Sequence, residues 1–167
     1  MMKRAALALL LLSACAPEAA PPKEPEAPVV ETLAAPAAVA SDAEKYKAAP
    51  AGEITVTSPV AGARVTSPLV ADGTAINSWF FEGQFVAELA VDGEVLAQSP
   101  AMQAGDKSWT DPGPVGFRAE LAFDVTKETN AELILSEDMP EFIDEANDIR
   151  GPARSVRIPV VLLPPAK

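Results

Sequence analysis

Apolar and polar residues alternate in short runs from residue 54 to the end of the chain. In one run Phe117, Leu121 and Val125 recur at even spacing, and Arg118 and Glu120 lie between them. A period of two places the apolar side chains on one face of a β-strand and the polar ones on the other. Runs of this kind, separated by Gly, Pro, Asp and Asn, lie at 54–57, 69–76, 84–91, 94–99, 115–125, 131–136 and 155–163.

Turn signals between these runs support the same interpretation. Asp92-Gly93 is the residue pair that favours positive φ at both centres of a type I′ turn, so the flanking runs should form a hairpin. Ser58-Pro59 and Ser67-Pro68 bracket a turn through Gly62, and proline is confined to strand ends or edges. Seven short strands in about 110 residues predict an all-β fold, an immunoglobulin-like antiparallel β-sandwich of about seven strands.

The N-terminus has the organisation of a secretory signal. Lys3 and Arg4 precede an apolar run at 5–12, which is too short to span a bilayer. The following Leu12-Ser13-Ala14-Cys15 resembles the lipobox of bacterial lipoproteins. That resemblance implies that the signal is cut before Cys15 and that its thiol carries a diacylglycerol. The alternative is a plain secretory signal in which Cys15 has no role.

A linker separates this signal from the strands. Residues 16–50 are rich in Pro and Ala and contain no large aromatic residue except Tyr46. Such a segment cannot bury enough apolar surface to offset the ordering of its backbone. We therefore predict a signal peptide at 1–14, a lipidated Cys15 with a disordered Pro/Ala-rich tether at 15–52, and the β-domain at 53–167.

Composition excludes several classes of protein. The chain has no His, one Cys and a formal charge of -11. Without His, neither Ser-His-Asp catalysis nor an ordinary zinc site is available, and one Cys makes no internal disulfide. The acidic balance argues against nucleic acid as a partner. An anionic membrane surface is equally unfavourable for the folded part, so attachment to a membrane should be covalent or should lie in an apolar segment.

A series of short segments in the β-region carries a resemblance to a known family. The series begins with 54–59 and Gly62, and its most specific part is the FEG element after Gly-Thr-Ala. The remaining segments are 67–69, 73–75, 79–85, Asp92-Gly93, Phe117, Leu121 and 158–160. Together they resemble the Gmad2 family, an immunoglobulin-like module of spore-germination and other bacterial cell-envelope proteins. The resemblance covers nearly all of residues 53–163, and it implies the sandwich fold and an envelope location. The preceding sequence does not read as a germination domain, and the insert at 138–152 is acidic and long, so a germination role does not follow.

An aromatic cluster is the strongest candidate for a binding site. Trp79 and Phe80 precede Glu82, and Trp109 lies in a polar, turn-rich stretch. Exposed aromatic rings can stack on a sugar or a peptide. Trp79, Phe80, Glu82 and Trp109 are therefore our candidate binding residues.

The alternative is that these aromatics belong to the core. In that case Phe81 and Phe85 enter the interior, and Glu82 accepts backbone hydrogen bonds at a strand start. Strand alternation would place Phe80 and Phe81 on opposite faces, so one of them should point outward.

A run of carboxylates follows the sixth predicted strand. Asp138, Glu141, Asp144 and Asp148 are weak calcium candidates, since calcium takes six to eight oxygen ligands. Their spacing matches no EF-hand, so a solvated acidic loop is the default and we expect no metal or other cofactor. Residues 141–149 contain enough helix formers for a short helix.

These observations predict a binding or structural module rather than an enzyme. Glu82 and Asp111 are the candidates for a catalytic carboxylate pair, but nothing in the sequence fixes such a pair. We expect a lipid-anchored, extracytoplasmic adaptor whose partner is an unknown envelope protein, with cell-wall glycan as the alternative ligand. By resemblance to other lipoproteins, Ala16 after the cysteine implies sorting to the outer membrane if the host has one.

Overall fold

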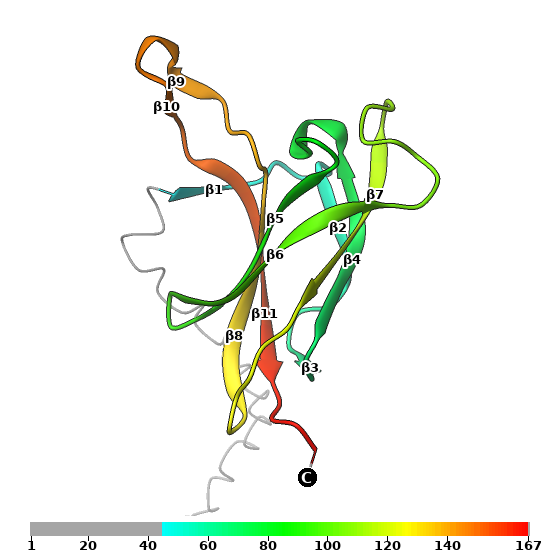
Figure 1. Cartoon of the computed structure of the whole chain (residues 1–167), viewed down its shortest axis with the longest axis vertical. Helices are drawn as coiled ribbons and strands as arrows, with labels where there is room; N and C mark the ends of the chain where they lie inside the picture. The colour runs from blue at the N-terminus through cyan, green and yellow to red at the C-terminus, as the bar shows by residue number, and fades with distance from the viewer. Residues whose placement is uncertain (1–44, 167) are drawn as a thin grey trace, which may run out of the picture. The chain divides into compact units, whose positions relative to one another are not determined.

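Strands and the turns between them account for almost all of residues 45–166, which are the residues that the computed structural model describes (Figure 1). Two short 3-10 helices, η1 (Asn77–Trp79) and η2 (Glu145–Asn147), interrupt them. The strands are β1 (Tyr46–Ala48), β2 (Ile54–Ser58), β3 (Ala63–Val65), β4 (Leu69–Ile76), β5 (Gln84–Val91), β6 (Glu94–Ala104), β7 (Pro114–Leu121), β8 (Thr129–Ser136), β9 (Phe142–Asp144), β10 (Ile149–Arg150) and β11 (Ala153–Leu162).

One curled sheet forms both layers of the sandwich. Its strand order is β1-β11-β8-β5-β6-β7-β4-β2. Strand β1 pairs with the start of β11, and β3 pairs with the end of β11. The long strand β6 connects the two layers, because it pairs with β5 of one layer over most of its length and with β7 of the other layer at its end. Phe85 on β5 packs against Phe117 on β7, with ring centroids 5.0 Å apart, although the two strands are not neighbours in the sheet. The two layers therefore face each other across an apolar interior.

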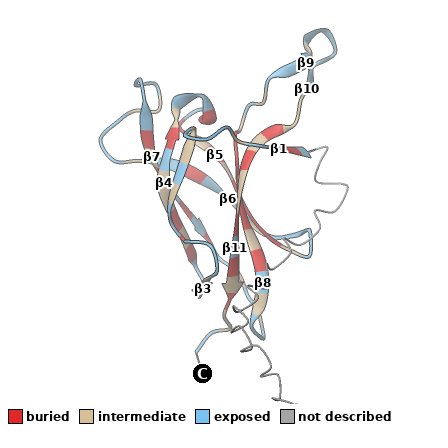
Figure 2. Cartoon of the chain, turned by 180° about the vertical axis from the view of Figure 1, so that it is seen from behind, coloured by how far each residue is buried: buried red, intermediate tan, exposed pale blue. Residues whose placement is uncertain are grey.

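Buried residues are concentrated on the long strands of the main sheet, where their side chains fill the interior (Figure 2). On β7 the buried residues Phe117, Ala119 and Leu121 alternate with the exposed residues Arg118 and Glu120, as the sequence predicts. The largest fully buried side chains are Trp79, Phe85, Phe117, Leu69, Leu89, Leu121, Leu133, Leu135, Leu162, Val115 and Val160. The predicted fold, an immunoglobulin-like β-sandwich, is confirmed.

The turn predictions are also confirmed. Asp92 and Gly93 have φ values of 51° and 83° and connect the antiparallel strands β5 and β6. Pro59 follows β2 and Pro68 precedes β4, so both lie at strand ends, and both of their peptide bonds are cis.

A close approach between strands requires glycine at position 73. A Cβ built there would lie 2.1 Å from the Thr55 carbonyl oxygen and 2.8 Å from carbons of the Phe117 ring. Gly73 is paired with Phe117 in the register of β4 and β7, so the ring occupies the space that a side chain would need.

The folded domain begins before residue 53, which corrects the predicted boundary of the tether. Tyr46–Ala48 form β1, which runs parallel to the start of β11 and is paired with Ala153–Ser155. Tyr46 is buried. This pairing depends on a partner more than a hundred positions away, so the local Pro/Ala composition did not reveal it.

Candidate functional site

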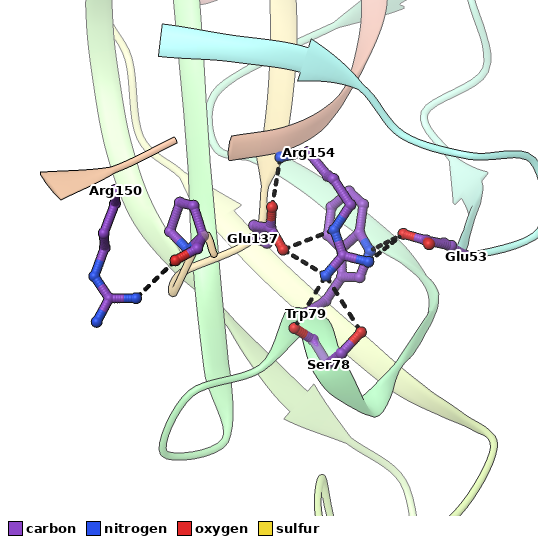
Figure 3. Close-up of polar contacts among 7 residues, drawn as sticks. Glu53, Ser78, Trp79, Glu137, Arg150 and Arg154 are labelled. Atoms are coloured by element: carbon purple, nitrogen blue, oxygen red, sulfur yellow. Dashed lines mark hydrogen bonds and ion pairs between the residues drawn. The ribbon is translucent and has the colours of Figure 1, made fainter. Parts of the chain in front are cut away.

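Trp79 lies in the core and not on the surface, which corrects the prediction of an exposed aromatic platform. Its relative exposure is 0%, and its ring meets Phe85 edge to face with centroids 5.6 Å apart. Phe80 is buried as well and packs on the same ring at 5.1 Å. The indole Nε1 donates a hydrogen bond of 3.2 Å to Glu53 (Figure 3). Neither ring is available to stack on a ligand.

The helical turn η1 explains why both rings point inward. Trp79 ends this turn and Phe80 resumes extended backbone, so the two residues do not follow strand alternation. Phe81 points outward and is exposed, which confirms that Phe80 and Phe81 lie on opposite sides. Phe85 enters the core as the alternative interpretation predicted, but the placement of Phe81 in the core was wrong.

A partly buried charge network lies beside Trp79 (Figure 3). The Arg154 guanidinium donates from Nε and Nη2 to Glu137 Oε2 and from Nη1 to Glu53 Oε2 at 2.7 Å. The carboxylate of Glu137, which is almost completely buried, also accepts the backbone N–H of Arg154 at 2.7 Å. Hydrogen bonding and the negative charge of Glu137, together with Glu53, raise the pKa of Arg154. The pairing joins segments that lie far apart in the sequence, so no local pattern indicated it.

Two of the predicted binding residues do come together near the surface. Glu82 and Gly83 form a tight turn with φ values of 52° and 82°. A Cβ added to Gly83 would lie 3.3 Å from Trp109 Cδ1, so the indole lies against this turn. Trp109 is half-buried, and its backbone N–H donates to Gln103 Oε1 at 2.8 Å. Phe81, Glu82 and Trp109 therefore share one region of the surface.

Asp138 joins this region from the acidic run. Partial burial raises the pKa of Asp138, and the nearby charge of Glu82 raises it further. Its backbone N–H donates to the Trp79 carbonyl oxygen at 3.3 Å. These contacts connect the start of the acidic run to η1 and to the turn at Glu82.

The acidic run forms a projecting hairpin, where the sequence predicted a short helix. Strands β9 and β10 pair with each other in a separate two-stranded sheet and are joined by η2 (Figure 1). Asp144 caps η2, because its carboxylate accepts the backbone N–H and the side-chain amide of Asn147. Antiparallel pairing with Ile149 and Arg150 holds the segment extended.

The four calcium candidates do not form a ligand set. Asp138 lies at the base of the hairpin beside Glu82, whereas Asp144 is occupied with Asn147 near its tip. Within residues 45–166 no three His, Cys, Asp or Glu side chains gather closely enough to hold a metal ion. Asp138, Glu141, Asp144 and Asp148 therefore act as separate surface carboxylates.

The same hairpin exposes several large apolar side chains. Ile143 is 71% exposed, and Met139, Phe142 and Ile149 are exposed as well. Phe81 lies exposed on the neighbouring turn. The β9–β10 hairpin lies at the same end of the sandwich as η1 and the β6–β7 connection (Figure 1).

A second polar cluster lies where the chain enters the domain. Glu88 on β5 is buried and accepts hydrogen bonds from Tyr46 Oη and, at 3.0 Å, from Lys45 Nζ. Burial raises the pKa of Tyr46, and the hydrogen bond to Glu88 raises it further. The ring packs with Ala90, Ile134 and Ala153 in a small apolar cluster separate from the main core. This cluster fixes β1 on the sheet.

The predicted lipidation site, Cys15, lies outside the described residues. The same is true of the predicted signal peptide at 1–14 and of most of the tether. The described part of the chain contains no helix that is long and apolar enough to cross a membrane.

Comparison with models of protein families shows which family the domain resembles. Residues 53–141, more than half of the 167-residue chain, match the family model of Gmad2, described as the immunoglobulin-like domain of bacterial spore germination. No curated protein matches the sequence. The match ends at Glu141, so the β9–β10 hairpin lies beyond it.

Proposed function

Because the chain belongs to the Gmad2 family of immunoglobulin-like domains, we propose that it is a binding module of the bacterial cell envelope, anchored by lipid at Cys15. It acts outside the cytoplasm as an adaptor between proteins. The family match supports an envelope module, and the sequence around Cys15 resembles a lipobox.

The observation that supports an adaptor function is the exposed apolar surface of the β9–β10 hairpin, at one end of the sandwich. Phe142, Ile143 and Ile149 leave large side chains in solvent on a hairpin that projects from the sandwich. Such a group of apolar side chains favours contact with another protein, because association removes it from water.

Glycan binding has weaker support. A sugar-binding platform needs the open face of an aromatic ring, but Trp79 is buried and Trp109 is half-buried against Gly83. Absence of enzymatic activity stays a prediction that follows from the fold family.

Lipid anchoring is tested by changing Cys15→Ser in the full-length protein expressed in its host. We expect the protein to move from the membrane fraction to the soluble extracytoplasmic fraction, because the thiol is the site of acylation. Ser13→Ala, which keeps a small residue in the lipobox, is the matched control and should leave the protein in the membrane. If the Cys15→Ser protein is processed normally and stays in the membrane, the anchor is not at Cys15.

A further inference from the structure

We propose that the β9–β10 hairpin, residues 139–150, is the docking element of this module, and that its partner is a protein surface with an apolar groove bordered by Lys and Arg. The inference rests on the proposed adaptor function and specifies where the partner binds and what chemistry it presents. The two strands of this hairpin lie directly after the family match, which ends at Glu141.

The apolar part of the argument is the exposure of the hairpin. In a soluble domain an isolated exposed apolar residue needs no explanation, but a group of them marks an interaction surface. Met139, Phe142, Ile143 and Ile149 lie within twelve positions of one another and are all exposed. They lie on a two-stranded element that pairs with no strand of the main sheet.

Charge selects the class of partner. Glu141, Asp144, Glu145 and Asp148 lie among these apolar side chains, and Arg150 is the only basic residue between 139 and 150. Its guanidinium is already engaged, because it lies 3.9 Å from the centre of the Phe142 ring and donates to the Pro140 carbonyl oxygen at 2.7 Å. The hydrogen bond of Arg150 is drawn as a dashed line in Figure 3. The hairpin is therefore acidic around an apolar centre. A basic border on the partner would complement it, whereas an anionic lipid surface would repel it.

The hairpin is held in shape before it meets a partner. Two-stranded hairpins are only marginally stable alone in water. Here Asp144 caps η2, Arg150 covers one side of Phe142, and the Gly151 N–H donates to the Glu141 carbonyl oxygen at 2.9 Å. At its base, the ion pair between the buried Glu137 and the partly buried Arg154 fixes the point where both strands leave the sandwich. This order lowers the conformational entropy that binding would cost.

The edges of the main sheet offer less to a partner. At one end β1 and β3 have three residues each, and at the other end β2 has an irregular register and is followed by Pro59. Short and irregular edges provide few free backbone groups for strand addition. Recognition through the hairpin is therefore favoured over recognition through a sheet edge.

The test is site-specific photocrosslinking of the full-length lipoprotein in its host cells. A photoreactive amino acid replaces Ile143, and in a parallel strain it replaces Val60, which is equally exposed but lies on the turn between β2 and β3. We expect a discrete protein adduct from position 143 and none from position 60, with the crosslinked peptide of the partner lying in a Lys- and Arg-rich region. Crosslinks from 60 alone would overturn the docking site but leave the adaptor function standing.

Binding of the purified partner then tests both parts of the chemistry. Ile143→Ser with Ile149→Ser should weaken the affinity by about tenfold or more, since buried apolar anchors dominate interface energetics. Glu141→Lys with Glu145→Lys should also weaken it and remove its sensitivity to salt, whereas Val60→Ser should change nothing. An unchanged affinity in the Ile143 variant, or adducts with lipid or glycan only, would overturn the docking inference. The absence of a specific protein adduct from both position 143 and position 60 would overturn the docking inference together with the adaptor function on which it rests.

Discussion

Arg154 connects three segments that are far apart in the sequence. Its guanidinium contacts Glu53 before β2, Ser78 in η1 and Glu137 after β8. Buried ion pairs add little net stability, but removing one partner leaves the other charge uncompensated in a poorly hydrated site. At the residue scale, Arg154 is therefore where we expect a single substitution to be most harmful.

Arg154→Met should lower the free energy of unfolding by about 3 kcal/mol, because the buried carboxylate of Glu137 loses its counter-charge. Arg64→Met is the matched control, since Arg64 pairs with Glu128 in full exposure and its loss should have little effect. Urea unfolding of the purified variants gives both values. Adding Glu137→Gln to Arg154→Met should recover part of the loss, and equal effects of the Arg154 and Arg64 variants would contradict the argument.

The hydroxyl of Tyr46 provides a direct optical measurement, because this residue is the only tyrosine in the chain. Burial and the bond to Glu88 raise its pKa in the folded protein. The folded state therefore holds the proton more tightly than the unfolded state does. The stability that this adds is complete below the ordinary tyrosine pKa of about 10 and is lost as the pH rises through the higher folded value.

An alkaline titration followed by tyrosinate absorbance should therefore give an apparent pKa above that of the same protein unfolded in urea. Glu88→Gln should bring the two values closer, because it removes the negative charge next to the hydroxyl. Identical titrations of folded and unfolded protein would mean that β1 is not bound to the sheet in solution.

At the scale of elements, the sequence predicted those strands whose pattern is complete within one run. Residues 69–76 and 84–91 were predicted with the bounds that β4 and β5 have. The missed elements are stabilised by distant partners: Tyr46 on β1 by Glu88, and Ala63–Val65 on β3 by Val160–Leu162. The helix expected at 141–149 failed because helix formers are a weak preference, and cross-strand pairing overrides it.

At Gly73 the strand β4 lies so close to Thr55 on β2 and to Phe117 on β7 that no side chain fits. Gly73→Ala should lower the free energy of unfolding by about 2–3 kcal/mol, because the new methyl group would displace Phe117 or separate β4 from β2. Thr74→Ala, at an exposed position of the same strand, should change it by less than about 0.5 kcal/mol. Thermal unfolding of the two variants compares them, and similar melting temperatures would contradict the close approach.

At the scale of the whole molecule, the candidate site was predicted only in part. Glu82 and Trp109 lie together because the turn at Gly83 places them there, which no local pattern could indicate. Trp79 and Phe80 were candidates for a surface platform because aromatic residues cluster before Glu82, but a single helical turn directs both rings into the core. The departure from the family at 138–152 was visible in the sequence, whereas its form as a projecting hairpin was not.

The position of β1 also determines how the domain would carry a mechanical load. A pull from the N-terminal side enters the described domain at Lys45 and acts first on β1, whose pairing with β11 covers only Tyr46–Ala48. The pairing of β11 with β8 extends from Ser155 to Leu162, so the core lies behind a much longer set of backbone bonds. Under tension β1 should therefore detach before the longer pairing of β11 with β8 breaks, and residues 45–52 would then span up to about 25 Å. Detachment of β1 would thus lengthen the connection to the N-terminal side while the core of the sandwich stays folded.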